Sequence, residues 1–153
     1  MAHEQQQDRL DLEIRRHVYD QLLNGRAAPT IAATAAALGV EPSKVRAGFE
    51  RLAQARVLVL QEGSREIMMA NPFSAVPTPF HVEAGGHSWW GPCIWDALGI
   101  LAMVKQDGRI RTACGDCGEA MTLTIKQGTL TAGESIIHFG LPAKHWWDNI
   151  VFT

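Results

Sequence analysis

The sequence predicts an α+β protein, in which an N-terminal winged-helix module of three helices is followed by a mostly antiparallel sheet with one principal helix. Apolar residues recur at three- to four-residue spacing in the first third of the chain, which is typical of amphipathic helices. In the second half, short runs of alternating apolar and polar residues are separated by turns containing Gly or Asp, which is typical of strands. A chain of 153 residues, 46% of them hydrophobic, is large and apolar enough to form a core, which excludes a disordered or fibrous protein.

Three helices and a hairpin are expected first. The apolar spacing predicts a helix that ends at Gly25, a short alanine-rich helix over residues 31–38, and a longer helix that begins near Pro42. Residues 57–60 and 67–70 are rich in aliphatic side chains and flank a turn that contains glycine, so they predict two short paired strands. Three helices followed by a hairpin are the elements of a winged helix.

The second module is expected to contain one helix and several strands. Residues 89–104 predict the end of a strand that runs into a helix, with Pro92 in the first turn of that helix. The other strands expected from alternation lie at residues 81–84, 109–113, 121–126, 135–139 and 150–153.

A proline-rich segment separates the two modules. Residues 71–79 (NPFSAVPTP) contain three prolines and no helical period, so we expect an extended connector. The sequence thus predicts a winged-helix-like domain at residues 1–70, a connector at 71–80 and an α+β domain at 81–153.

Charge and hydropathy limit the classes of partner. Lys and Arg number 14 against 16 Asp and Glu, so the net charge of −2 gives no general attraction for nucleic acid. No stretch approaches the roughly 20 apolar residues that span a bilayer, and the first 16 residues lack the apolar region of a signal peptide. We therefore expect a cytoplasmic protein that binds no membrane. In a reducing compartment, its three cysteines favour thiol or metal chemistry over disulfides.

The segment GPCIWD, residues 91–96, carries the first candidate site. If Pro92 begins a helix, Cys93 lies in its first turn, where free backbone N–H groups and the helix dipole stabilise a thiolate and lower the pKa of the thiol. Asp96 follows three residues later on the same helix face, so the pair combines a soft nucleophile or ligand with a proton carrier. The alternative is structural, with a small buried cysteine beside an aspartate that balances the helix dipole.

The segment CGDCG, residues 114–118, carries the second candidate site. The C-x-x-C spacing of Cys114 and Cys117 allows two thiolates to reach one metal ion, but a closed zinc site needs four ligands. A structural zinc would need Cys93 together with one of four histidines, His81, His87, His138 or His145. The alternative is a turn with buried or free thiols, and glycines followed by a strand do not favour a thioredoxin-type redox motif.

A winged helix also suggests DNA binding. Its third helix carries a thin basic stripe of Lys44, Arg46, Arg51 and Arg56. Residues 1–72 hold nine Lys or Arg and nine Asp or Glu, so a solvated helix face explains the stripe equally well. A mercury- or metal-responsive DNA-binding regulator is therefore the alternative function, although the charge balance does not favour DNA as a partner.

Three segments in order resemble the alkylmercury lyase (organomercurial lyase) family. They are WWGPCIWDALGILAMV with Cys-x-x-Asp at a helix start, RIRTACGDCGEAMTLTI after it, and HFGLPAKHWWDNIVFT near the end. The likeness extends to the winged-helix-like module and to the NPFSAVPTPF connector, so it covers nearly the whole chain.

The resemblance implies cleavage of a carbon–mercury bond by protonolysis, which gives a hydrocarbon and Hg(II) without an added cofactor. It makes Cys93 the mercury ligand and Asp96 the proton shuttle, while Cys114 matches a family cysteine usually regarded as structural. This agrees with the chemistry of the residues, because thiolate sulfur is a soft ligand and a carboxylate beside it moves a proton to carbon. The implied partners are an organomercurial or Hg(II), and cellular thiols that release the product.

The chain departs from the family pattern at one point. The other catalytic cysteine of the family lies just past a strand similar to residues 150–153, where the given sequence ends. We therefore expect the segment with that cysteine to be absent and catalysis to be weakened or lost, unless Cys117 takes its place. Mercury binding needs only two nearby sulfurs, so it depends less on that segment than catalysis does.

Overall fold

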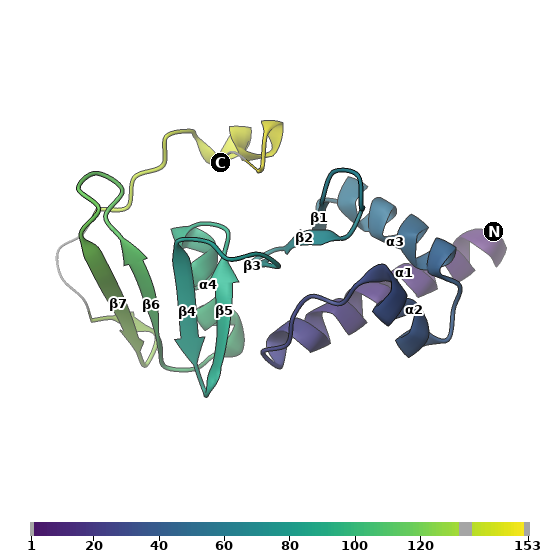
Figure 1. Cartoon of the computed structure of the whole chain (residues 1–153), viewed down its shortest axis with the longest axis horizontal. Coiled ribbons are helices and arrows are strands. Elements are labelled where there is room, and N and C mark those ends of the chain that lie inside the picture. Colours follow the sequence, from purple (N-terminus) through teal and green to yellow (C-terminus); the bar gives the residue numbers. More distant parts are fainter. Residues whose placement is uncertain (1, 132–135, 152–153) are drawn as a thin grey trace.

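The computed structural model describes residues 2–131 and 136–151, in which three helices precede a set of strands and one further helix (Figure 1). The first part contains α1 (Ala2–Leu23), α2 (Ile31–Leu38), α3 (Pro42–Gln54), β1 (Leu58–Leu60) and β2 (Ile67–Ala70). The second part contains β3 (Phe73–Ser74), β4 (Phe80–Ala84), β5 (His87–Gly91), α4 (Ile94–Val104), β6 (Gly108–Ala113), β7 (Ala120–Lys126), β8 (Thr129–Leu130) and the 3₁₀ helix η1 (Ala143–Asp148).

The described strands form one antiparallel sheet in the order β1-β2-β3-β5-β4-β6-β7-β8. The helix α4 packs on β4 and β5, where it covers Val82 and Ala84, while the alternate residues His81 and Glu83 point to the other face. The predicted α+β class with a mostly antiparallel sheet is confirmed.

Local sequence signals explain the three N-terminal helices. The Thr30 hydroxyl accepts a hydrogen bond from the backbone N–H of Ala33 at 3.1 Å and so caps α2, and Gly39 ends that helix in a left-handed conformation with φ 64°. Pro42 then begins α3, where the missing N–H of proline costs nothing. The element order matches the expected one, while the assignment as a winged helix stays a prediction.

One cluster of buried residues runs from α1 to β7. Ile14 and Val18 of α1 and Phe49 of α3 are all fully buried within it. The end of α1 also contacts the sheet, because the indole N–H of Trp89 donates to the backbone oxygen of Leu22 at 2.6 Å. The division into a 1–70 domain, a 71–80 connector and an 81–153 domain stays a prediction.

Two of the expected strands were wrong, and the connector, which was expected to be extended, also takes part in the sheet. The connector contains the short strand β3, which pairs with β2 and β5 and so makes the sheet continuous. Residues 136–139 are irregular and residues 150–151 form a turn, where strands were expected; residues 135, 152 and 153 of those strands lie outside the described residues. Alternation alone was misleading here, because the described part of the segment pairs with no strand and Pro142 precedes the 3₁₀ helix η1.

Among the described residues, no helix combines the length and apolar character that crossing a membrane requires.

Candidate active site

The junction between β5 and α4 positions the first candidate site. A Cβ atom on Gly91 would lie 2.7 Å from the backbone nitrogen of Ala97, so only glycine allows the first turn of α4 to pack this closely on the strand end. The Thr78 hydroxyl donates to the backbone oxygen of Gly91 at 2.6 Å and holds the same strand end from the connector. The helix begins at Ile94, and Cys93 is therefore its N-cap residue rather than part of a first turn begun by Pro92.

The structure brings Cys93 and Asp96 together. The Cys93 thiol donates a hydrogen bond to Asp96 Oδ2, with Sγ and Oδ2 3.1 Å apart. The Asp96 carboxylate also accepts from the backbone N–H of Cys93, as the third residue of a capping box does. Asp96 thus caps the first turn of α4 and, at the same time, accepts the hydrogen bond of the Cys93 thiol.

Burial sets the protonation of this pair. Burial is the largest cause that raises the pKa of the Cys93 thiol, and the neighbouring Asp96 carboxylate adds to it. Backbone N–H groups of Asp96 and Trp95 oppose the change, and together these effects raise the pKa from 9.0 to about 11. The expectation of a lowered pKa for Cys93 was therefore wrong, because loss of solvent outweighs the helix N-terminus. Burial also raises the pKa of Asp96, against the effect of its hydrogen bonds from Cys93. At neutral pH the proton resides on sulfur, beside a carboxylate with increased proton affinity.

A small cavity of about 60 Å³ adjoins the pair. Its wall combines β2 and the residue after it with the β5–α4 junction and the C-terminal segment. The residues that line it are Met69, Asn71, Pro92, Cys93, Asp96, Phe139, Trp146, Ile150 and Val151. The Tyr19 hydroxyl of α1 donates to the backbone oxygen of Asn71 at 2.8 Å, so the N-terminal helices help to fix this wall.

A wider apolar concavity of about 840 Å³ lies next to the small cavity and shares Phe139 and Trp146 with it. The rings of these two residues are 5.1 Å apart between centroids. Trp95, in the first turn of α4, lines the same concavity and is 62% exposed. The remaining lining residues are Gly140, Leu141, Pro142 and Ala143.

Sequence reasoning did not find the second wall of the cavity. Phe139 was assigned to a strand, Trp146 was given no role in the site, and Met69 was assigned to a hairpin far along the chain from Cys93. The guanidinium of Arg56, at the end of α3, lies 5.4 Å from the ring centroid of Trp147 and so connects the C-terminal segment with the helical part. The aromatic pair Trp146–Trp147 was the one signal in the sequence that pointed to a packed segment rather than an edge strand.

The structure separates the other two cysteines from the Cys93 cavity. Cys114 and Cys117 lie in the turn between β6 and β7, and neither lines the cavity. Cys117 is exposed, and the pKa of Cys114 is lowered by hydrogen bonds from the backbone N–H groups of Cys117 and Asp116. Within residues 2–131 and 136–151, no three side chains of the His, Cys, Asp and Glu types are grouped closely enough to hold a metal ion. The metal-binding roles of these cysteines stay predictions.

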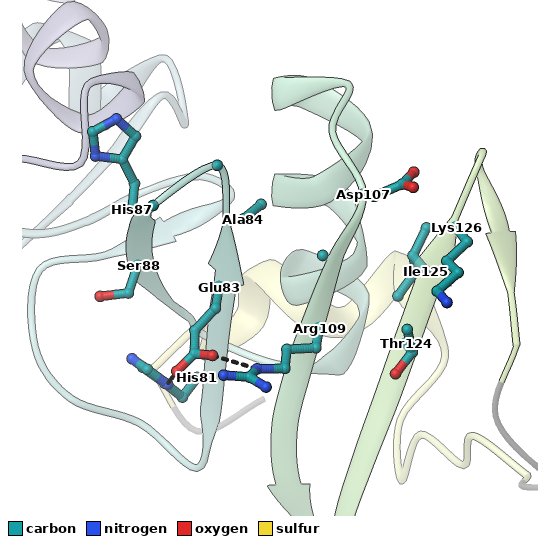
Figure 2. Close-up of a pocket in the computed structure, with 13 residues that line it drawn as sticks. His81, Glu83, Ala84, His87, Ser88, Asp107, Arg109, Thr124, Ile125 and Lys126 are labelled. Atoms are coloured by element: carbon teal, nitrogen blue, oxygen red, sulfur yellow. Dashed lines mark hydrogen bonds and ion pairs between the residues drawn. The ribbon is translucent and has the colours of Figure 1, made fainter.

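The histidines considered as zinc ligands lie elsewhere. His81 and His87 line a concavity of about 690 Å³. On the sheet face opposite α4, the Arg109 guanidinium donates to the Glu83 carboxylate (Figure 2). The arginines on this face hold the pKa of Glu83 below its usual range. The His145 ring lies 2.9 Å from Asp148 Oδ2 in η1. This sheet face is therefore a charge-paired surface.

The three arginines of the basic stripe considered for DNA make contacts within the protein. Arg51 binds the Asp11 carboxylate with two hydrogen bonds of 2.6 and 2.7 Å, and the side chains are 29% and 16% exposed. Arg46 donates to the backbone oxygen of Ser64 at 3.2 Å, and Arg56 packs on Trp147. DNA binding stays a prediction that these contacts do not favour.

Comparison of the sequence with models of known protein families shows which family this chain belongs to. The alkylmercury lyase family model matches residues 73–153, which include the Cys93–Asp96 pair and the C-terminal segment. The chain belongs to the alkylmercury lyase family. The family assignment suggested by the three sequence segments is thereby confirmed.

The fold is also similar to that of a solved structure, over a larger share of the chain than the family model matches. A crystal structure described as the mercury-bound form of MerB2 matches with a TM-score of 0.63 and 24% identity over 80% of this chain. The present chain covers 58% of the length of that protein. Among curated proteins, none matches this sequence.

Proposed function

We propose that this alkylmercury lyase family member cleaves carbon–mercury bonds by protonolysis, with Cys93 as the mercury ligand and Asp96 as the proton carrier. The observation that supports this most directly is the 3.1 Å hydrogen bond from the Cys93 thiol to the Asp96 carboxylate beside a small apolar cavity. A soft sulfur and a carboxylate that share one proton are the two groups that this reaction needs.

The proposed reaction begins with capture of the organomercurial cation. A bond forms between Cys93 Sγ and mercury, the S–H bond breaks, and the proton passes to Asp96 Oδ2 along the existing hydrogen bond. The raised pKa of Asp96 favours this acceptance, because burial makes the neutral carboxylic acid less costly than the carboxylate.

Transfer of that proton to carbon completes the reaction. The C–H bond forms as the C–Hg bond breaks, and the electron pair of the C–Hg bond becomes that of the C–H bond. The hydrocarbon leaves and Hg(II) stays on Cys93. No oxidation or reduction occurs, so we propose that no added cofactor takes part.

A second thiolate on mercury increases the electron density that carbon takes with it. No other cysteine lines the cavity in the described part of the chain, so we propose that thiols from solution supply this ligand and later remove Hg(II). Turnover by this chain should therefore be slow and should increase with thiol concentration. Cytoplasm, where monothiols are abundant, is the proposed compartment.

The apolar concavity beside the cavity would accommodate the organic group. It begins at Phe139 and Trp146, which line both spaces, and Trp95 extends it along α4. An apolar lining binds a hydrocarbon substituent through burial and offers no competing hydrogen bonds.

The test is release of hydrocarbon from phenylmercury or methylmercury with excess thiol. We expect benzene or methane above the rate of the thiol alone, and we expect Cys93→Ser to return the rate to that background, because a hydroxyl is a hard and poorly ionised ligand. Circular dichroism of the variant checks that it folds. If the unaltered chain gives no product above the thiol control, the proposed activity of this chain is rejected.

A further inference from the structure

The turn between β6 and β7 holds two cysteines in a fixed backbone. The N–H of Cys114 donates to the backbone oxygen of Glu119 at 2.8 Å, and the N–H of Gly118 donates to the backbone oxygen of Cys114 at 3.0 Å. Gly118 has φ 74°, a left-handed conformation that glycine adopts without strain. These contacts close the loop tightly, so both thiols belong to one short turn with a defined shape.

Hydrogen-bond donors within the turn are directed at one sulfur. The backbone N–H groups of Asp116 and Cys117 donate to the Cys114 sulfur, and the Cys117 thiol donates to it as well. A metal binds thiolates, and N–H donors around a sulfur stabilise it in that form before the metal arrives. The turn therefore groups the two thiols and directs backbone N–H groups towards Cys114.

The number of ligands at the turn restricts the kind of ion. In the described ranges, no third side chain of the His, Cys, Asp or Glu types joins the two cysteines in a metal-binding group. Structural zinc takes four ligands, whereas a soft cation such as Hg(II) is satisfied by two thiolates on opposite sides. Cys117 is exposed and Cys114 partly buried, so an ion can reach both from solvent.

The turn lies at the same end of the sheet as Cys93. Phe80 at the start of β4 pairs with Gly91 at the end of β5, and the next residue of β4, His81, pairs with Arg111 near the end of β6. The end of β6 that leads into the turn therefore points the same way as the end of β5 that leads into Cys93. Figure 1 shows the β6–β7 loop at the end of the sheet where the C-terminal segment also lies.

We propose that the Cys114–Cys117 turn is a second mercury site, which binds one Hg(II) as a two-thiolate complex separately from Cys93. Two S–H bonds break, two S–Hg bonds form and two protons go to solvent, with no change of oxidation state. The site rests on the proposed function only for the source of its ion, since it would accept the Hg(II) that leaves Cys93.

The experiment measures how much Hg(II) the whole chain retains against excess monothiol, with native mass spectrometry as the readout. A chelating pair resists a monothiol competitor better than a single thiol, because its second bond forms within the molecule. We expect Cys93→Ser to retain one Hg(II) per chain, and the double variants with Cys114→Ser or Cys117→Ser to retain none. X-ray absorption on the Cys93→Ser complex should show two sulfur neighbours.

The outcomes separate this site from the proposed lyase activity. Loss of all retained Hg(II) in Cys93→Ser, retention that survives Cys117→Ser in that background, or one Hg(II) bridging two chains would each overturn the site. Stoichiometric zinc retention by Cys93→Ser under the same competition would also overturn it, in favour of a zinc site. If the unaltered chain releases no hydrocarbon while Cys93→Ser retains Hg(II), the lyase proposal fails and the second site stands.

Discussion

The β5–α4 junction and the β6–β7 turn place the same side chain, cysteine, in opposite environments. At the junction, burial raises the pKa of Cys93 to about 11. At the turn, backbone N–H groups lower the pKa of Cys114 while the site stays open to solvent. Both sites offer N–H donors to a sulfur, so the difference lies in how much water each sulfur loses.

This contrast shows which effect decides the state of a thiol. Donors at the start of a helix favour the thiolate, but a few such contacts do not compensate for removing a charge from water next to a carboxylate. The junction therefore stores a proton, which protonolysis consumes. The turn favours the thiolate form of Cys114, which suits binding of a soft cation.

The largest expected effect is on the pH dependence of thiol alkylation. A thiol with a pKa of about 11 is ionised to roughly one part in a thousand at pH 8, and its ionised fraction rises as the pH increases towards 11. We expect iodoacetamide to modify Cys114 at neutral pH and Cys93 only in alkaline solution, as measured by mass spectrometry of peptides. Equal rates for Cys93 and Cys114 at pH 7 would remove the contrast between the two sites.

The next largest effect concerns the carboxylate at the junction. Asp96→Asn keeps the shape of the side chain and can still accept the hydrogen bond of the thiol, but it cannot carry a proton. We expect phenylmercury binding to persist and hydrocarbon release to fall by a factor of roughly 10². Asp20→Asn is the matched control, because the Asp20 side chain is 63% exposed on α1. If Asp96→Asn cleaves as fast as its parent, Asp96 serves only to cap α4.

The sequence was a good guide to local structure and a poor guide to the environment of the site. The capping signals at Thr30, Gly39 and Pro42 are local, so the first three helices were predicted close to their observed bounds. The i,i+3 spacing likewise placed Asp96 beside Cys93. The sign of the Cys93 pKa shift was not predictable in this way, because burial depends on surfaces contributed by distant segments.

The C-terminal segment illustrates the same limit. Alternation suggested strands, but a strand also needs a pairing partner, and the described part of this segment pairs with no strand of the sheet. The aromatic residues of the segment instead form a wall of the Cys93 cavity. Their role depends on contacts across the fold, which spacing along the chain does not encode.

Alanine substitutions at Gly91 and Gly115 compare how tightly the β5–α4 junction and the β6–β7 turn are packed. A Cβ at Gly91 would lie 2.7 Å from the Ala97 backbone nitrogen, whereas a Cβ at Gly115, in the cysteine turn, meets no atom within 4 Å. We expect Gly91→Ala to lower the free energy of unfolding by about 1–3 kcal/mol through overpacking. Gly115→Ala should change it by less than about 0.5 kcal/mol. Urea denaturation measures both, and equal values would mean that the junction tolerates a wider β5–α4 contact.

The smallest expected effect tests whether the C-terminal segment protects the junction. The Arg56 guanidinium lies over the Trp147 ring, and an exposed contact of this kind contributes about 0.5–1 kcal/mol. Arg56→Gln should therefore open the segment more often and speed the alkylation of Cys93 by roughly 2- to 5-fold at a fixed alkaline pH. Alkylation of Cys114 should stay the same, because its turn does not contribute to the cavity. Arg46→Gln is the control, since Arg46 contacts the Ser64 backbone instead of the segment. An unchanged Cys93 rate in Arg56→Gln would show that the buried state of this thiol comes from the junction itself, whereas equal acceleration at both cysteines would indicate general loosening of the fold.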